Sequence, residues 1–272
     1  MIELGTVQET LVLPLWARAK DAVTDDPILN DTYARDIVAR LDYDFTNIES
    51  EQTASHQLVW PVRAYNFDNS IREYIKEYTD AAVINIGAGL DTTFQRIDNG
   101  TVHWVNIDLP DVVHLRQKLI PDSERERTIA KSVFDFTWLD DINLLIKDRP
   151  TMFMAAGVLC YFEAREVKSI FCKLADSYPK AHVIFDAMSK LTVWGANRDI
   201  MKKSGMDKSV RLKWHLKRAH RLKKWVDTIE IVEEYPMFSR LPVKKAWSKK
   251  LARDIKIASR LRLYQLVHIQ LS

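Results

Sequence analysis

AAVINIGAGLD, residues 81–91, is the stretch that decides the fold of this 272-residue chain. Its apolar first half, Ala81–Ile86, predicts a buried strand. The strand runs directly into Gly87-Ala88-Gly89, although the whole sequence contains only seven glycines. Two glycines at one strand end indicate a tight turn in which the backbone closely approaches another group.

A second apolar strand is predicted at Val102–Ile107, and it ends in Asp108, 19 residues after Gly89. A glycine turn after one parallel strand and a carboxylate after the next is typical of nucleotide-type cofactor sites. The carboxylate accepts hydrogen bonds from ribose hydroxyls, while the glycines leave room for the rest of the ligand. An ordinary strand-to-helix turn is the alternative interpretation of the glycines alone.

The residues that follow the second glycine distinguish between cofactors. A pyrophosphate needs a dense set of backbone N–H groups at a helix N-terminus, but the third glycine of the dinucleotide motif is replaced here by Thr92. Asp91 would repel phosphates and attract a cation. The sequence therefore favours S-adenosylmethionine, which carries an ammonium and a sulfonium group, over NAD.

The composition is that of an ordinary globular protein, with 47% hydrophobic and 28% charged residues. No apolar run approaches the roughly 18 residues that a membrane-spanning helix needs. The N-terminus lacks a basic segment followed by an apolar one, and Cys160 and Cys172 fit no metal-binding motif. We expect a reduced, cytoplasmic protein with no membrane association and no metal site.

Charge is distributed unevenly around a net value of +3. Residues 1–189 have a balance of −11, whereas residues 190–272 have a balance of +14. Such asymmetry can mark an anionic partner such as nucleic acid. Because the basic residues are spread over helices without an aromatic stacking motif between them, solvated helix faces are the preferred explanation.

Strands and helices alternate through the middle of the sequence. Predicted strands lie at 81–86, 102–107, 128–132, 151–155, 182–186, 228–235 and 263–271. Predicted helices lie at 7–23, 32–41, 60–79, 112–119, 164–177 and 243–259, with a polar loop at 42–55. This alternation predicts an α/β fold in which helices cover both faces of a parallel sheet. We expect one domain, with an N-terminal helical lid (1–62) and a basic helical insert (188–226) before the last two strands.

Several blocks spread over nearly the whole chain occur in the order and spacing of one known family. These blocks are Glu9–Lys20, Asp26–Asp31, Asn85–Thr92, Ile107–Pro110, Ser132–Trp138 and Gly157–Phe162. The sequence resembles the leucine carboxyl methyltransferase family, in particular its bacterial and archaeal branch of small-molecule O-methyltransferases. The resemblance implies a Rossmann-like, seven-stranded and mostly parallel methyltransferase sheet, with S-adenosylmethionine as the methyl donor.

The resemblance also implies which residues bind the cofactor. Gly87 and Gly89 would lie against its methionine portion, and Asp108 would hold the ribose. Asp135 and the neighbouring Phe136 would contact the adenine. These five positions form the expected nucleoside and methionine sites.

Two further residues correspond to family positions at the reaction centre. Arg63 matches an arginine that engages a carboxylate, so we expect it to act in both cofactor binding and catalysis, and Tyr161 matches a tyrosine that lines the centre. Arg18 matches a basic residue of the N-terminal lid. The chain departs from the family at Ala156, where a glutamate near the cofactor amino group is usual, and at Thr93, where an arginine is common.

The expected reaction is an in-line displacement, in which a protein mainly aligns donor and acceptor and excludes water. A carboxylate acceptor is already ionised at pH 7 and needs no general base, and Arg63 could orient it through paired hydrogen bonds. A hydroxyl acceptor would need a proton acceptor, for which His215 and His220 are the histidines we consider. We expect an O-methyltransferase that acts on a carboxyl or hydroxyl of a small, anionic or aromatic molecule.

Other functions stay open at this stage. Ala156 and Thr93 are compatible with a methyltransferase-fold protein that binds its ligand without turnover. The eukaryotic-type branch of the family acts on a protein carboxyl terminus instead. Trp194, Trp214 and Trp225 lie in the insert, where they suit either the wall of an acceptor site or ordinary core packing.

Each site residue also has a simpler interpretation when taken singly. Arg63 could be a helix-surface arginine paired with Asp68 or Glu73. Asp135 could merely cap the following turn, and Tyr161 could pack at a strand end. The structure separates these possibilities.

Overall fold

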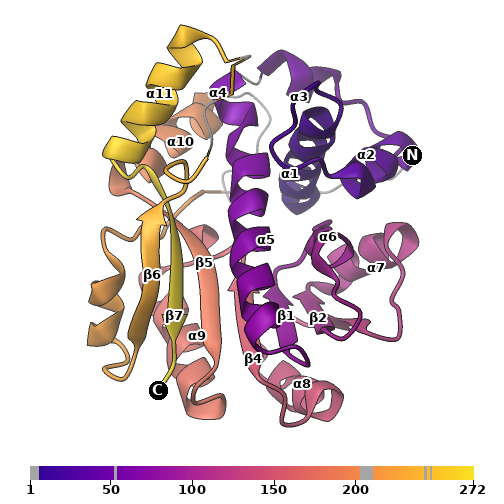
Figure 1. The fold of residues 1–272 in the computed structure, drawn as a ribbon, viewed down its shortest axis with the longest axis vertical. Coiled ribbons are helices and arrows are strands. Elements are labelled where there is room, and N and C mark those ends of the chain that lie inside the picture. Colours follow the sequence, from indigo (N-terminus) through magenta and orange to yellow (C-terminus); the bar gives the residue numbers. More distant parts are fainter. Residues whose placement is uncertain (1–5, 52–53, 203–210, 242–243, 246) are drawn as a thin grey trace.

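The computed structural model of the chain describes residues 6–51, 54–202, 211–241, 244–245 and 247–272. Seven strands form one sheet with the order β3-β2-β1-β4-β5-β7-β6 (Figure 1). The strands are β1 Ala82–Ile86, β2 His103–Asp108, β3 Glu126–Ala130, β4 Thr151–Ala155, β5 His182–Met188, β6 Glu230–Pro236 and β7 Tyr264–Gln270. β7 runs antiparallel to β5 and β6, and the other neighbouring pairs are parallel. This confirms the predicted seven-stranded, mostly parallel sheet.

Helices flank both faces of this sheet. They are α1 Thr6–Ala22, α2 Thr32–Arg40, α3 Thr46–Glu51, α4 Ala54–Gln57, α5 Val59–Glu77, α6 Thr93–Ile97, α7 Pro110–Leu119, α8 Trp138–Ile146, α9 Ala164–Ser177, α10 Lys190–Lys202 and α11 Lys249–Arg260, with 3-10 helices η1 Leu159–Tyr161 and η3 Ala219–Lys224. Successive strand side chains point to opposite faces. In β1, Ile84 and Ile86 pack with α8 and α9, whereas Val83 packs with α5 and α6. Because both faces are buried, the strand is apolar except for Asn85, whose side chain hydrogen-bonds to Asp91 and Asn106.

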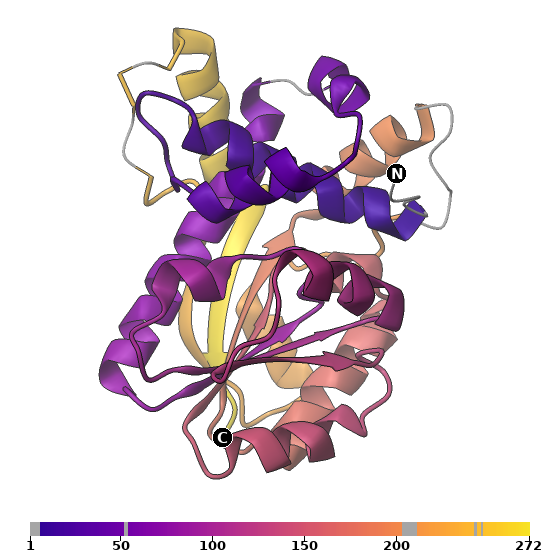
Figure 2. The same cartoon turned by 90° about the vertical axis from the view of Figure 1, so that its right-hand side faces the viewer.

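The N-terminal helices α1–α4 gather with α10 and α11 beyond one end of the sheet (Figures 1 and 2). This is the end at which the parallel strands finish, since Leu11 of α1 lies against Gly89 in the turn after β1. Adjacent strands β1 and β4 also mark the point where the strand order reverses. Open α/β sheets bind ligands at such a switch point, outside the carboxyl ends of the strands.

Two segments differ from the sequence-based prediction because polar groups define them. The predicted loop 42–55 contains α3 and α4, and the Asp44 side chain accepts a hydrogen bond from the Thr46 backbone N–H at the start of α3. β3 begins two residues earlier than predicted, at Glu126. That carboxylate is buried against Arg116 and Asn106, so a hydrophobic pattern does not reveal it.

The basic insert is less helical than predicted. Within the described residues, α10 ends at Lys202, residues 211–218 have no regular structure and η3 follows. The backbone N–H groups of Lys213 and Trp214 donate to the carbonyl of Cys160, and that of Leu216 donates to Met188. These bonds to η1 and to the last residue of β5 replace the bonds that a continuous helix would make. Residues 203–210 of the predicted insert, like 243 and 246 of the last predicted helix, lie outside the described residues.

Among the described helices, none combines the length and the apolar character needed to cross a membrane.

Candidate active site

A cavity of about 730 Å³ lies at the carboxyl ends of β1, β2, β4 and β5. Its walls come from the turn after β1, from α1, α4 and α5, and from α10. Arg63, Gly87, Gly89, Asp108 and Tyr161, five of the predicted site residues, all line it. The volume lies within the range of about 300–1,000 Å³ that is usual for small-molecule sites.

The glycine turn has the tight geometry that the sequence predicts. Gly87 and Gly89 have φ values of 65° and 49°, a region that side chains other than glycine rarely adopt. A Cβ at Gly87 would lie 2.5 Å from Val158, and one at Gly89 would lie 2.8 Å from Leu11. The fully buried Arg116 donates to the Gly89 carbonyl, which fixes the turn from beneath.

Asp108 is held at the edge of the cavity by backbone donors. The Gly89 N–H donates to its Oδ2 at 2.7 Å, and the Leu109 N–H donates to its Oδ1 at 2.8 Å. Burial raises the pKa of Asp108, while these two hydrogen bonds oppose the rise. The carboxylate that follows β2 is therefore oriented before any ligand binds, as a ribose-binding residue must be.

Asp91, the acidic residue predicted to disfavour phosphates, also lines the cavity. Its Oδ2 accepts hydrogen bonds from the Thr93 N–H and from Asn85, and its Oδ1 accepts one from the Thr93 hydroxyl. Thr93, one of the two departures from the family pattern, thus holds the Asp91 carboxylate in place.

Arg63 points from α5 into the cavity and is 13% exposed. Its partner is Asp186 at the end of β5, with the Arg63 Nη1 and Asp186 Oδ2 atoms 3.7 Å apart. The surface pairing with Asp68 or Glu73 is therefore wrong. Gly157, with φ of 74°, supports this arrangement, because a Cβ there would collide with the guanidinium.

Asp186 was not predicted from the sequence, although a signal was present. The apolar strand that starts at His182 contains this carboxylate near its end, as the strand before Asp108 does. Asp186 is 7% exposed, lines the cavity and accepts a hydrogen bond from the Gly157 N–H at 2.5 Å. Beside it Ala156, the second departure from the family, contributes only a methyl group.

Tyr161 and Cys160 follow β4 in η1, and both line the cavity. Burial, reinforced by neighbouring Cys160, raises the pKa of Tyr161 well above its ordinary value, although Arg63 opposes the shift. Burial also raises the pKa of the Cys160 thiol to about 12. Both groups are therefore protonated at neutral pH, so Tyr161 is a hydrogen-bond donor at this site.

Two predicted cofactor residues lie away from the cavity lining. Asp135 is exposed on the loop after β3, where its Oδ1 accepts hydrogen bonds from the backbone N–H and hydroxyl of Thr137. Phe136 packs against the hydrophobic core beneath the sheet. On the same loop, Phe134 contacts Phe162, a residue that lines the cavity. The two rings pack edge-to-face with their centroids 4.8 Å apart.

The histidines and two of the tryptophans of the insert, which were considered for the acceptor site, lie away from the cavity lining. His215 and His220 do not line the cavity, and of the seven histidines only His56 of α4 does. Trp214 and Trp225 pack into the core with Phe171 and Phe185, so core packing is the correct one of the two interpretations left open for these residues.

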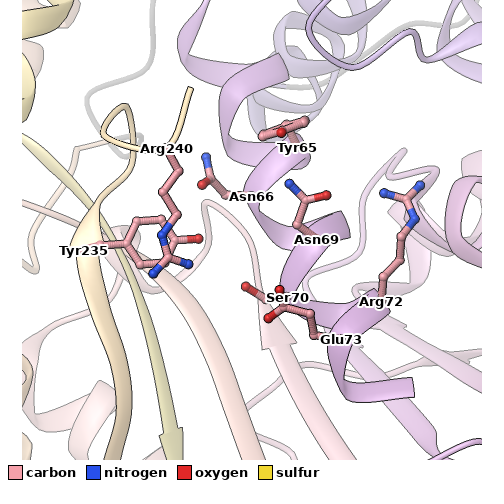
Figure 3. Close-up of a pocket in the computed structure, with 8 residues that line it drawn as sticks. All are labelled: Tyr65, Asn66, Asn69, Ser70, Arg72, Glu73, Tyr235 and Arg240. Carbon is pink, nitrogen blue, oxygen red and sulfur yellow. The ribbon is translucent and has the colours of Figure 1, made fainter. Parts of the chain in front are cut away.

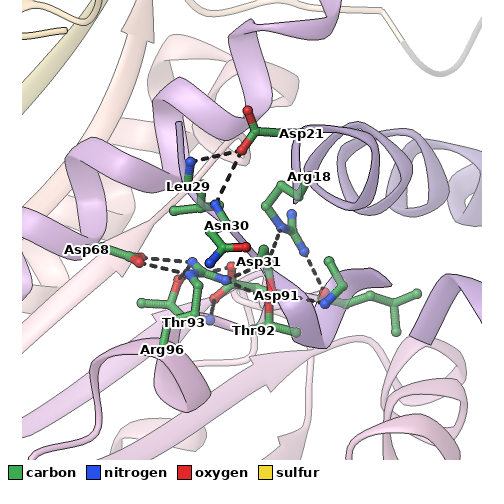
Figure 4. Close-up of polar contacts among 12 residues, drawn as sticks. Arg18, Asp21, Leu29, Asn30, Asp31, Asp68, Asp91, Thr92, Thr93 and Arg96 are labelled. Atoms are coloured by element: carbon green, nitrogen blue, oxygen red, sulfur yellow. Dashed lines mark hydrogen bonds and ion pairs between the residues drawn. The ribbon is translucent and has the colours of Figure 1, made fainter. Parts of the chain in front are cut away.

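A buried polar cluster links the N-terminal helices to the glycine turn (Figure 4). Arg18 of α1 donates to Asp31 and to the Leu90 carbonyl, both at 2.9 Å. Asp31 in turn caps α2 through the Ala34 N–H. The predicted lid residue Arg18 thus contacts the glycine turn through Leu90, and it also lines the cavity.

Arg96 of α6 forms the centre of the same cluster. It donates two hydrogen bonds of 2.8 Å to Asp68 of α5 and one of 2.7 Å to Asp31. Arg96 also donates hydrogen bonds to the hydroxyl oxygens of Thr92 and Thr93. Burial raises the pKa of Asp31, but the charges of Arg96 and Arg18 outweigh burial and bring that pKa below its usual value.

A second, smaller cavity of about 360 Å³ lies between α5 and the end of β6 (Figure 3). Its arginines already have partners. Arg240 stacks on the ring of Tyr235 and pairs with Glu233, and Arg72 donates to the Arg96 carbonyl. We therefore place the chemistry in the larger cavity.

The strand order, the glycine turn after β1 and the fixed carboxylate after β2 define the class. The protein is an S-adenosylmethionine-dependent methyltransferase. Its glycine cradle and oriented Asp108 fit a nucleoside that carries an amino-acid tail.

Comparison with known proteins gives the family. The model of the leucine carboxyl methyltransferase family matches residues 12–175, and the chain belongs to this family. The chain is 32% identical to the tetracenomycin polyketide synthesis O-methyltransferase of Streptomyces glaucescens, over 71% of this chain and 70% of that protein. It is 27% identical to an S-adenosyl-L-methionine-dependent methyltransferase of Gibberella zeae, over 72% and 71% of the two chains. A solved structure of a candidate methyltransferase from Thermobifida fusca matches with a TM-score of 0.63 at 15% identity, covering 94% of each chain.

Proposed function

We propose that this protein methylates a carboxylate oxygen on a small molecule with an apolar or aromatic body. The observation that carries the proposal is the lining of the cavity beyond the cofactor residues. Apolar side chains from α1, α5 and α10 make up this part of the lining: Leu11, Leu13, Trp60, Phe67 and Leu191. Such a surface suits a ring-bearing acceptor, as in the polyketide pathway for which the Streptomyces relative is named.

The cofactor supplies an electrophilic methyl group on its sulfonium. We assign Gly87 and Gly89 to the methionine portion, Asp108 to the ribose hydroxyls and Arg63 to the methionine carboxylate. Asp135 and Phe136 remain candidates for the adenine, and Phe134 joins them because its ring contacts Phe162 of the lining.

A carboxylate acceptor fits the titratable groups of the cavity. It is ionised at pH 7 without a general base, and the one histidine among the described residues of the lining, His56, is exposed. Tyr161, which keeps its proton, would donate a hydrogen bond that orients the acceptor oxygen. The N-terminal helices would act as the lid that excludes water from the reacting atoms.

We further propose a cytoplasmic location, which the two free cysteines, Cys160 and Cys172, support.

A matched acceptor panel tests this proposal. Purified protein and methyl-labelled S-adenosylmethionine are incubated with polycyclic aromatic carboxylic acids, with the corresponding phenols and with peptides that end in a free carboxylate. We expect methyl esters of the aromatic acids, with a rate that changes little between pH 6 and 9. Cofactor binding without product from any acceptor would favour a binding protein, and methylation of the peptides alone would favour a protein carboxyl methyltransferase.

A hydroxyl acceptor is the second candidate, because His56 lines the cavity. A phenol must lose its proton near the transition state, and imidazole is the side chain best suited to accept it. In that case phenols would be the substrates, and His56→Ala would lower the rate by about 100-fold or more. An unchanged rate in His56→Ala would leave the carboxylate as the acceptor.

A further inference from the structure

We propose that Asp186 is a cofactor-binding residue that holds the ammonium group of S-adenosylmethionine. With Arg63 it would form a two-charge subsite for the amino-acid end of the cofactor. The Arg63 guanidinium would bind the carboxylate of that group and the Asp186 carboxylate would bind its ammonium. The inference rests on cofactor binding in the large cavity and adds a residue to that binding site.

Asp186 has unused hydrogen-bonding capacity in a buried position. Its side chain is 6% exposed, and its Oδ1 accepts the Gly157 N–H. Within the described ranges no donor reaches Oδ2, since the Arg63 Nη1 atom is 3.7 Å away, beyond the usual limit of about 3.2 Å. Burying a carboxylate without donors is unfavourable, so an additional cation at this oxygen would be stabilising.

Arg63 has the complementary capacity. A guanidinium carries five N–H donors, yet in the described part of the chain the ion pair with Asp186 is its sole polar contact. The two opposite charges lie side by side at a distance too long for a hydrogen bond between them. An α-amino acid presents an ammonium and a carboxylate on one carbon, which is the group that such a pair can bind.

Each oxygen of the other two carboxylates that line the described cavity already accepts at least one hydrogen bond from the protein. Asp91 accepts from Asn85 and Thr93 through both of its oxygens, and both oxygens of Asp108 accept backbone N–H groups. Of these three carboxylates, Asp186 has the one oxygen without a donor in the described residues. Asp186 is also close to the residue assigned to the methionine portion. Its Oδ1 accepts the Gly157 N–H, and the side chain of the next residue, Val158, would lie 2.5 Å from a Cβ at Gly87.

Calorimetric titration with three ligands tests the assignment. The ligands are S-adenosylhomocysteine, its analogue with hydrogen in place of the amine, and 5′-methylthioadenosine, which lacks the amino-acid end. In the wild type we expect the deaminated analogue to bind about 10-fold or more weakly than S-adenosylhomocysteine, as loss of a charged hydrogen bond predicts. In Asp186→Asn we expect a similar loss for S-adenosylhomocysteine, but a change of less than about 3-fold for the other two ligands.

The comparison of ligands separates binding from positioning. If Asp186 only orients Arg63, Asp186→Asn weakens S-adenosylhomocysteine and the deaminated analogue equally, and the proposal is overturned. Equal affinity of the wild type for these two ligands would overturn it without any variant, which covers the case of an unfolded Asp186→Asn protein.

A second-site variant provides the positive control. In the Asp186→Asn background, Ala156→Glu places a carboxylate on the neighbouring residue of the wall. We expect it to restore affinity for S-adenosylhomocysteine but not for the deaminated analogue, and restoration of both would count against an ammonium site. If the wild type binds no S-adenosylhomocysteine at all, it is the proposed function that fails, whereas bound S-adenosylhomocysteine without discrimination of the amine refutes only the role of Asp186.

Discussion

Two of the buried arginine–carboxylate groups in the described part of the chain, one around Arg96 and one at Arg63, differ in their hydrogen bonding. Arg96 is surrounded by Asp31 and Asp68 at 2.7–2.8 Å and by two threonine hydroxyls. Arg63 faces Asp186 at 3.7 Å without a hydrogen bond between them. A saturated cluster stabilises the fold, whereas a spaced pair on a cavity wall is available to a ligand.

Their positions agree with this difference. The Arg96 cluster joins α2, α5 and α6, and through Arg18 it fixes the first helix over the glycine turn (Figure 4). The pair of Arg63 and Asp186 lies on the wall that α5 and β5 share. Because α5 contributes to both groups, one helix connects the structural cluster to the proposed cofactor site.

The largest expected effect is on the saturated cluster. Arg96→Met leaves Asp31 and Asp68 buried without their main counterion, so the free energy of unfolding should fall by about 3–5 kcal/mol. Urea denaturation followed by circular dichroism measures this loss. Arg72→Met is the matched control, because Arg72 is half exposed and its removal should cost less than about 1 kcal/mol. Equal losses in the two variants would remove the distinction between the clusters.

Arg63→Met should affect ligand binding more than stability, in contrast to Arg96→Met. The free energy of unfolding should fall by less than in Arg96→Met, because only one ion pair of 3.7 Å without a hydrogen bond is lost, although Asp186 stays buried without its cation. The affinity for S-adenosylhomocysteine should fall by about 10-fold to 100-fold, because a charged hydrogen bond to the ligand is lost. Calorimetric titration and urea denaturation on one preparation give both numbers. A variant that is unstable but binds normally would place Arg63 among the structural residues.

Gly157→Ala tests the backbone that positions the spaced pair. Gly157 and Gly100 both have positive φ, and alanine at either should cost about 1 kcal/mol of stability. Only at Gly157 would the added Cβ meet Arg63, since nothing lies within 4 Å of a Cβ at Gly100. We expect weaker cofactor binding in Gly157→Ala alone, by roughly 10-fold if one charged hydrogen bond is displaced. Equal binding by both variants would argue against this contact.

The smallest expected effect is on the pH dependence of stability. The folded pKa of Asp31 lies below its usual value, so this carboxylate stabilises the fold above about pH 4. The contribution is lost as the pH falls through the folded pKa, at about 1.4 kcal/mol per unit of difference between the folded and unfolded pKa. The free energy of unfolding, measured by denaturation at several pH values between 6 and 2.5, should therefore fall less steeply with falling pH in Asp31→Asn than in the wild type. Parallel curves would show that Asp31 does not titrate with folding.

Much of the fold was predictable because its signals are local. An apolar strand, a glycine turn and a carboxylate after the next strand are each set by contiguous residues, and all three were predicted correctly. β3 and the helices α3 and α4 were predicted less well, since Glu126 and Asp44 define them through polar contacts that a hydrophobic pattern does not contain.

The site was predictable only in part. Gly87, Gly89, Asp108, Arg63 and Tyr161 were chosen from motifs, and the structure brings them to one cavity. His215 and His220, considered as bases for a hydroxyl acceptor, do not line the cavity, because residues 211–218 bond to η1 and to the end of β5 instead of continuing a helix. No local signal gives the direction that such a segment takes.

By itself, the sequence determined the strand, the glycine turn and the carboxylate at the end of the second strand, because backbone geometry at glycine and the alternation of strand side chains are properties of neighbouring residues. Only the tertiary structure decided which carboxylate each arginine faces. Arg63 and Asp186 lie on α5 and β5, and Arg96 meets Asp31 and Asp68 from three different helices. Such pairings depend on burial and distance in the packed fold, and these exist only after the sheet and its helices have assembled.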